Sequence, residues 1–227
     1  MPWGSGSRRT LRKPLSCERV KVNWEHPHNK GLLYWSLLNS AQVTDLVTGA
    51  VSASTPGAWT VNGDGSLIGS SSAVSLALNR SMVFAATDTW YVYLDYKSPS
   101  TSANIYAIVT NNGTSSVGFR EESYIWVRVA GNYPTDFGPS TFVTRKRYLI
   151  KYSNGALTLW MSDGTYDTSS ITAGAITFSR IGSVDTWYFG GTLYEMAIWN
   201  GQLNIDGSEG FKIVNNPYGT PSSPRLI

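Results

Sequence analysis

The sequence is poor in the residues that catalytic and metal centres most often use. It has one cysteine, Cys17, and two histidines, His26 and His28, among 227 residues. A single cysteine excludes a disulfide within the chain, so a folded domain here depends on its apolar core. The two histidines flank Pro27 without a third ligand close by, which falls short of the pattern of a zinc site.

Charged residues and long apolar runs are also scarce. Asp, Glu, Lys and Arg make up 15% of the chain, where about 25% is usual. No run approaches the roughly 18 apolar residues of a membrane-spanning helix. The first residues lack the apolar core of an export signal. We therefore expect a soluble chain without a membrane span or a classical export signal.

The positive charge is concentrated at the start of the chain. Residues 1–30 hold seven basic and two acidic side chains, whereas the rest of the chain is slightly acidic. Such an arm either docks on an acidic surface, contacts nucleic acid or is a solvated terminus. If it docks, the candidate contact residues are Arg8, Arg9, Arg12 and Lys13.

The remaining basic residues are scattered, apart from Arg145-Lys146-Arg147. We interpret this triplet as an exposed strand edge, where charge opposes unwanted pairing with another strand. Nucleic acid is therefore not expected as a partner of the body.

Glycine, serine, threonine and aromatic residues are plentiful, which suits short strands joined by tight turns. The Asn154-Gly155 pair predicts a hairpin because both residues tolerate positive φ. Trp90–Tyr96 has aromatics on both faces and is expected to be a central strand. The predicted strands are Ala58–Val61, Val74–Leu78, Met82–Ala86, Trp90–Tyr96, Ile105–Thr110, Ser116–Arg120, Tyr124–Val129, Phe142–Thr144, Tyr148–Tyr152, Ala156–Met161, Ala175–Ile181 and Gly191–Trp199.

These strands predict an all-β fold, a two-sheet antiparallel sandwich with about a dozen strands. We expect a basic arm at residues 1–21, one sandwich domain at 22–218 and a C-terminal tail at 219–227. A short helix is expected at 208–215. Because Gly207 and Gly210 weaken helices, a frayed turn is expected there.

Short motifs near both ends of this domain resemble those of laminin-G-like, concanavalin-A-like jelly-roll proteins of tailed bacteriophages. The opening segment contains His-Pro-x-x-x-Gly-Leu at 26–32 and Asp-Leu-x-x-Gly at 45–49. The closing segment contains Phe-x-Gly-x-Leu-x-Glu at 189–195 and Asn-Pro-Tyr at 216–218. The resemblance covers about residues 22–218.

This resemblance implies a virion protein on the particle exterior, in the first place a capsid decoration or accessory protein present in repeated copies. Its partners would then be capsid or other virion proteins. A tail or fibre component is one alternative, and a carbohydrate-binding module that engages host surface polysaccharide is another; the roles are compatible.

Aromatic side chains on loops or on a concave sheet are the usual platforms for sugars. The candidates are Trp126, Tyr133, Trp187 and Tyr188. The alternative for each of them is a place in the apolar core.

No reaction centre is apparent, and we expect no enzyme activity. Retaining glycosidases need two carboxylates about 5 Å apart, whereas Glu121 and Glu122 are adjacent in sequence and Glu195 has no acidic neighbour. No cofactor is expected. Calcium would have only the loops at 62–65 and Asp163, which lack the dense acidic spacing of a dedicated site.

Overall fold

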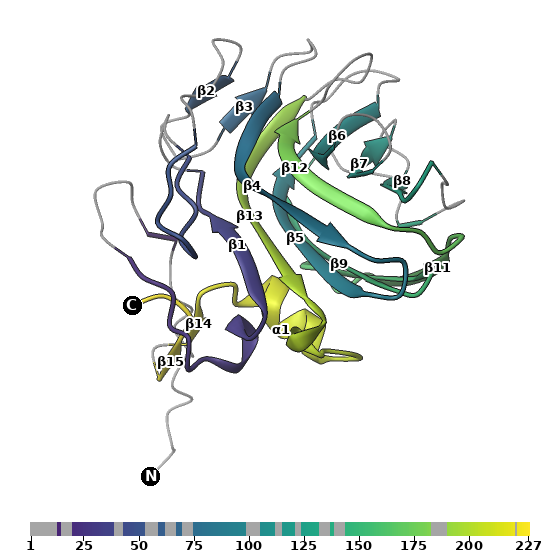
Figure 1. Ribbon diagram of the computed structural model, residues 1–227. Helices are drawn as coiled ribbons and strands as arrows, with labels where there is room; N and C mark the ends of the chain where they lie inside the picture. The colour runs from purple at the N-terminus through teal and green to yellow at the C-terminus, as the bar shows by residue number, and fades with distance from the viewer. Residues whose placement is uncertain are drawn as a thin grey trace.

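The computed structural model is an antiparallel β-sandwich (Figure 1). It describes residues 13–14, 20–38, 43–52, 59–61, 67–69, 75–98, 105–111, 115–120, 124–131, 137–138, 144–182, 190–220 and 222–227. Within these ranges lie two main sheets, a two-stranded ribbon and three short helical segments. The predicted all-β sandwich is confirmed.

The larger sheet contains eight of the described strands. They are β1 (Leu32–Ser36), β2 (Trp59–Val61), β3 (Leu67–Gly69), β5 (Thr89–Lys97), β9 (Lys146–Ser153), β10 (Ala156–Met161), β11 (Tyr166–Ser170) and β13 (Gly191–Asn200). Their order is β11-β10-β9-β5-β13-β3-β2, with β1 also paired to β13. Strand β5 pairs with β9 and β13 and is buried along most of its length, which confirms the predicted central strand.

The smaller sheet has the order β4-β12-β6-β7-β8. Its strands are β4 (Ser75–Phe84), β6 (Ile105–Thr110), β7 (Ser116–Arg120), β8 (Tyr124–Arg128) and β12 (Ile176–Gly182). Strand β4 joins two strands that the sequence predicted separately. The polar residues 79–81 do not end it, because a register shift in its pairing with β12 accommodates them.

Local turn chemistry sets the β9–β10 hairpin. Asn154 and Gly155 both have positive φ, 46° and 85°, as a tight two-residue hairpin turn requires. Strand β11 follows on the other side of β10. The sequence did not predict β11 because its residues are mostly polar, as suits a strand at the edge of a sheet.

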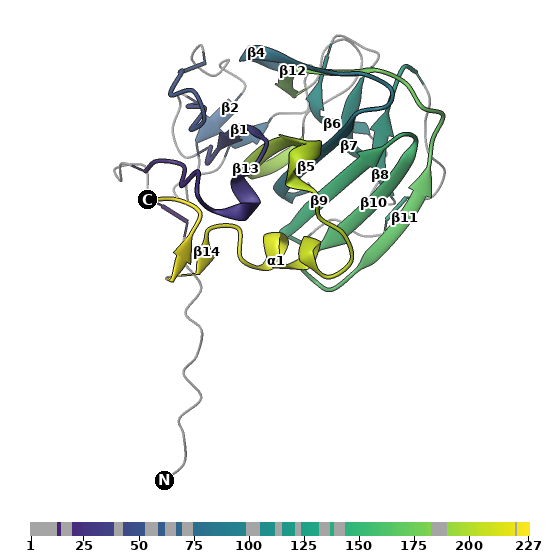
Figure 2. The same ribbon diagram turned by 60° about the horizontal axis from the view of Figure 1, so that its bottom comes forward.

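Two apolar cores lie on opposite faces of the larger sheet. The first lies between the sheets and includes Val92 and Ile198 of the larger sheet and Phe119 of the smaller one. The second lies on the outer face, where Tyr91 and Trp199 pack with residues of the C-terminal region. Figure 2 shows helix α1 (Glu209–Asn215) and the C-terminal segment lying across this outer face.

The short helix expected at 208–215 is confirmed as α1, and only the expected fraying at Gly210, which lies within the helix, was wrong. A Cβ atom built on Gly210 would lie 2.3 Å from the indole of Trp160 in β10. Gly210 therefore allows the helix backbone to approach a buried tryptophan, and this packing compensates for its low helix propensity. No helix in the described ranges is long and apolar enough to span a membrane.

The last residues pack against the beginning of the domain. Strands β14 (Gly219–Thr220) and β15 (Ser223–Pro224) form a small ribbon. Beyond it, the Lys21 amide donates to Ile227 O at 2.6 Å, and the Ile227 amide donates to Lys21 O at 2.8 Å. Residues 225–227, in the C-terminal tail expected at 219–227, thus pack against the beginning of the domain.

Candidate functional site

Two neighbouring strands place a pair of carboxylates on the outer face of the larger sheet. Asp95 of β5 and Glu195 of β13 lie opposite one another in the strand register. Their neighbours Leu94 and Met196 point into the core between the sheets, so strand alternation turns both acids outward. Asp95 is 1% exposed and Glu195 is 0% exposed.

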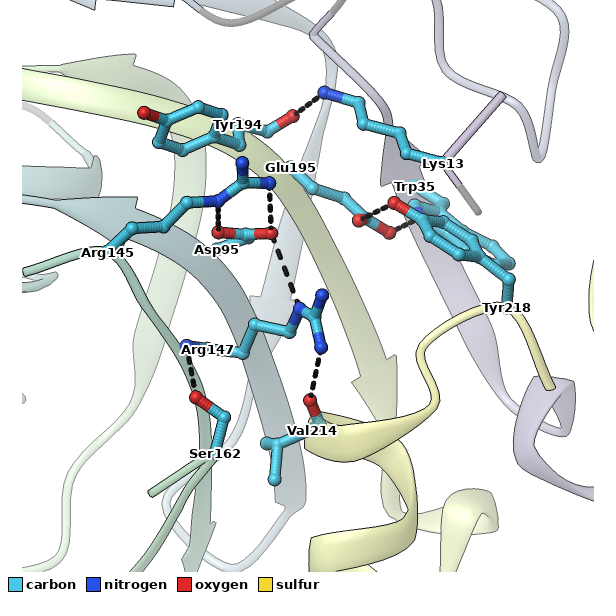
Figure 3. A network of polar contacts seen from close by, with 10 residues as sticks. All are labelled: Lys13, Trp35, Asp95, Arg145, Arg147, Ser162, Tyr194, Glu195, Val214 and Tyr218. Atoms are coloured by element: carbon cyan, nitrogen blue, oxygen red, sulfur yellow. Dashed lines mark hydrogen bonds and ion pairs between the residues drawn. The ribbon is translucent and has the colours of Figure 1, made fainter. Parts of the chain in front are cut away.

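Two arginines hold the Asp95 carboxylate (Figure 3). Arg145 donates from Nε to Oδ1 and from Nη2 to Oδ2, each at 2.8 Å, which is the bidentate geometry of a strong ion pair. The Arg147 Nε lies 3.5 Å from Oδ2. The Arg145 guanidinium also stacks on the Tyr194 ring, 3.6 Å from its centroid.

The same arginines border a hollow of about 320 Å³, which we call the cationic hollow. Its lining is Asp95, Arg145, Lys146, Arg147 and Ser162. The Arg147 Nη1 donates to Val214 O at 3.3 Å, so the last turn of α1 forms part of the surroundings. The Arg145–Arg147 triplet therefore lies at the start of β9, which has a paired strand on each side. Its interpretation as an exposed strand edge was wrong.

Glu195 has a different set of partners. The Trp35 indole donates from Nε1 to Oε1, and the Tyr218 hydroxyl donates to Oε2, both at 2.6 Å. Burial raises the pKa of the Glu195 carboxyl, and the negative charge of Asp95 raises it further, while the Tyr218 hydrogen bond opposes the rise. Both carboxylate oxygens are thus occupied by aromatic donors.

A buried arginine completes this side of the network. Arg225 is 1% exposed and lies against two indole rings, with its Cζ 4.5 Å from the ring centroid of Trp35 and 5.4 Å from that of Trp199. It donates from Nε to Asn29 Oδ1 at 3.0 Å and from Nη1 to Pro217 O at 2.6 Å. Burial lowers the pKa of Arg225 to about 10.

The motifs that suggested the phage resemblance supply much of this framework. His26 Nδ1 accepts the His28 amide at 3.1 Å and so caps η1 (Pro27–Asn29). Asp45 Oδ1 accepts the Val47 amide at 3.0 Å within the Asp-Leu-x-x-Gly turn. Together with Glu195 and Tyr218, these residues fold the two ends of the domain onto the sheet.

This arrangement is suited to holding elements together more than to general acid–base chemistry. A glycosidase needs carboxylates that can reach a substrate, whereas both acids are covered and hydrogen-bonded. Among the described residues, no group of three or more His, Cys, Asp or Glu side chains could hold a metal ion. Asp163, considered for calcium, pairs with Lys146 at 2.8 Å and accepts the Thr165 amide in its turn.

A second hollow, of about 530 Å³, lies at the turn that joins β4 to β5; we call it the turn hollow. Strand β13 and η2 (Gly201–Leu203) form its other wall. Apolar and polar side chains both line it. They are Leu33, Val83 and Phe84, and Thr87, Asp88, Thr89, Asn200 and Gln202.

The sequence-predicted docking residues are only partly described. Lys13 Nζ donates to Tyr194 O at 2.6 Å, beside the ring that supports Arg145 (Figure 3). Arg8, Arg9 and Arg12 lie outside the described residues, so docking by the arm stays a prediction.

Of the predicted glycan contacts, only Trp126 is described. It lies in β8 and is 2% exposed, so its ring is covered. Tyr133, Trp187 and Tyr188 lie outside the described residues, as do Glu121, Glu122 and the 62–65 loop. Binding of sugar by the aromatic set stays a prediction.

Sequence reasoning missed Asp95 and Arg225, and it identified Arg147 only as part of a charged strand edge. The available signal was the position of Asp95 within an otherwise apolar and aromatic strand, since a carboxylate there needs a cationic partner. The sequence does not identify the partner, because the residues are about 50 positions apart and meet only through the sheet.

Comparison with known proteins gives a fold-level likeness. No family model and no curated protein matches the sequence. Domain 4 of AbnA, an extracellular GH43 arabinanase from Geobacillus stearothermophilus solved with arabinotriose, is similar with a TM-score of 0.58 at 10% identity. The match covers 82% of this chain and 98% of that domain.

A Trypanosoma rangeli sialidase in complex with a difluoro-KDN ligand is similar with a TM-score of 0.54 at 8% identity. That match covers 82% of this chain and 33% of the sialidase, so the chain spans about a third of that enzyme's length. These likenesses show a shared sandwich fold with domains of carbohydrate-active proteins.

Proposed function

We propose that this chain is a non-catalytic carbohydrate-binding domain. The turn hollow carries the proposal. Its volume of about 530 Å³ lies within the range of small-ligand sites. Its lining complements a sugar ring, because apolar side chains can contact the C–H face and polar groups can bond the hydroxyls.

The apolar side of this hollow is accessible. Val83 is 70% exposed on β4 and stands next to the buried Phe84. On the polar side, Asp88 Oδ2 accepts the Ala85 amide at 2.7 Å, and Asn200 Oδ1 accepts the Gln202 amide at 3.0 Å. These bonds fix the turns and pre-position the side chains that would face a sugar.

The structural similarity of this chain to domain 4 of the arabinanase supports this proposal. Nearly all of the arabinanase domain aligns with this chain, and that domain was solved with arabinotriose. A module without its own reaction centre is also consistent with the covered carboxylates of the outer face.

A glycan array followed by calorimetry tests the proposal. Thr87→Trp should fill the hollow, and Gln202→Ala should remove a polar group, so each should weaken binding of an array hit at least tenfold. Thr168→Trp introduces the same bulk at an exposed position of edge strand β11 and should bind like the parent. Unchanged binding in Thr87→Trp would refute this location.

The motifs at the two ends favour a second candidate function, that of a phage particle component. They resemble those of phage laminin-G-like proteins, and the basic arm precedes a slightly acidic body. In this proposal the chain is a capsid decoration or accessory protein on the virion exterior, present in repeated copies. The arm would contact the shell or a neighbouring copy, and a tail or fibre position is the alternative.

Deletion of residues 1–12 tests this role. Because residues 20–22 pack with 226–227, the deletion should end before them and leave the body folded. The truncated protein should lose attachment to purified particles, and added salt should weaken attachment of the full chain. Full attachment by the truncated protein would place the contact on the sandwich.

A further inference from the structure

We propose that the cationic hollow is a subsite for the carboxylate or sulfate group of an acidic polysaccharide. This inference rests on the proposed carbohydrate-binding function and names a ligand class for a second position. The hollow lies near the C-terminal end of β5, at Asp95, whereas the turn hollow begins at Thr89 at the other end. One chain of sugar units therefore has two separate contact points.

Charge in the cationic hollow favours an anion. Arg145, Lys146 and Arg147 contribute three positive charges against the two carboxylates of Asp95 and Asp163, which leaves one excess positive charge. Lys13 lies nearby, at Tyr194 O, where its positive charge faces Glu195. Figure 3 shows Lys13, Arg145 and Arg147 around the same short stretch of β13.

The cationic side chains reach solvent. The exposed fractions are 41% for Arg145, 35% for Arg147 and 18% for Lys146. Asp95 is 1% exposed, so it holds the arginines from beneath without covering their solvent side. An anion in the hollow would meet guanidinium groups before it met the buried carboxylate.

Donor geometry also fits a carboxylate or sulfate. Arg147 uses Nε toward Asp95 and Nη1 toward Val214 O, so its Nη2 carries neither contact. The Ser162 hydroxyl accepts the Arg147 amide at 3.1 Å and keeps its own proton for another acceptor. The guanidinium of Arg147 and the hydroxyl of Ser162, at the backbone of the same residue, are thus two directed donors on this surface.

Contacts within the protein already hold both arginines of the hollow in place. Arg145 is fixed by two bonds to Asp95 and by the Tyr194 ring, and Arg147 by Asp95 and Val214. Binding usually loses side-chain conformational entropy when long side chains become ordered. Here the arginines are already ordered in the folded protein, so that loss on anion binding is smaller. The volume of about 320 Å³ suits one sugar unit, at the lower end of ligand sites.

Calorimetry on the full chain in 50 mM NaCl tests the proposal, with octagalacturonate, a neutral dextran octamer and a 20-base-pair DNA duplex as probes. We expect octagalacturonate to bind. Lys146→Gln and Arg147→Gln should each weaken this binding about tenfold, and added salt should weaken it further. Lys30→Gln removes the same charge at an exposed position outside the hollow and should have no effect.

Other results overturn the inference. Equal loss in Lys30→Gln and Lys146→Gln would show a general charge effect, and tighter binding of the DNA duplex would assign the surface to nucleic acid. Loss of octagalacturonate binding in Thr87→Trp but not in Lys146→Gln would leave carbohydrate binding standing and remove only the cationic subsite. Failure of every glycan on the array as well as octagalacturonate would contradict both proposals.

Discussion

Asp95 and Glu195 face each other across neighbouring strands, yet each carboxylate has its own partners. Arginines hold Asp95, whereas indole and phenol donors hold Glu195. Burial and the charge of Asp95 both raise the pKa of Glu195. Glycosidases also use a pair of neighbouring carboxylates, so the absence of activity needs a direct test.

We expect no hydrolysis by the pure protein, because both carboxylates are enclosed and fully hydrogen-bonded. A panel of bacterial polysaccharides should release no reducing ends above a buffer control. Glu195→Gln and Asp95→Asn serve as matched variants. Reducing ends released by the parent and abolished in either variant would contradict the prediction and make the pair catalytic.

Two tyrosines near Glu195 should respond oppositely to loss of their hydroxyl. Tyr218 donates to Glu195, so Tyr218→Phe should lower the free energy of unfolding by about 1.5–3 kcal/mol. The Tyr93 hydroxyl is buried without a hydrogen-bond partner among the described residues, so Tyr93→Phe should be neutral or stabilise by up to about 1 kcal/mol. Urea unfolding measures both; equal losses would contradict the assigned bonds.

Gly210→Ala tests the packing of α1 on Trp160, because the sign of the change in the free energy of unfolding depends on that contact. In an exposed helix this change stabilises by about 1 kcal/mol. Here the added methyl would meet the Trp160 ring at 2.3 Å, so we expect a net loss of about 1–2 kcal/mol in the free energy of unfolding. Asn215→Ala, at an exposed position of the same helix, is the control and should stabilise slightly. A gain in Gly210→Ala would show that α1 is loosely packed.

Protonation of His26 should destabilise the fold in mild acid. Burial lowers the pKa of His26 to about 4, helped by the positive charges of His28 and Arg225. Between pH 6.5 and 4 the unfolded chain therefore binds more protons at this residue, and its contribution to stability is lost as pH falls. From pH 6.5 to 4.5 this loss should be on the order of 2 kcal/mol.

His26→Asn isolates this effect, because the asparagine oxygen can still accept the His28 amide as a helix cap. The raised pKa of Glu195 acts in the opposite direction, with stability lost as pH rises, but it is common to both proteins. The variant should lose less stability than the parent between pH 6.5 and 4.5 in urea titrations. Identical pH profiles would contradict the depressed His26 pKa.

Local features of the fold could be predicted from sequence, and nonlocal features could not. Asn154-Gly155 specifies its hairpin through backbone preference alone, and β5 shows its central place in its own aromatic pattern. The expected fraying of the C-terminal helix was wrong because helix propensity says nothing about the tryptophan ring that packs against Gly210. The helix is stabilised by packing against Trp160, about 50 residues away in the sequence.

The candidate site illustrates the same limit. Arg145-Lys146-Arg147 was visible as a charge cluster, but its meaning depends on Asp95, which the sheet brings to it. Glu195 appeared isolated because its partners Trp35 and Tyr218 belong to distant motifs. Residue types could therefore be identified from the sequence, whereas their pairing required the strand order.

Hydrogen bonds between residues 21–23 and 225–227 give the body a nearly circular chain path. Any domain attached before residue 20 and any attached after residue 227 would leave from the same edge of the sandwich. A short linker between residues 227 and 20 would join the two ends, so circular permutation with new termini at the Asp163-Gly164 turn is geometrically available.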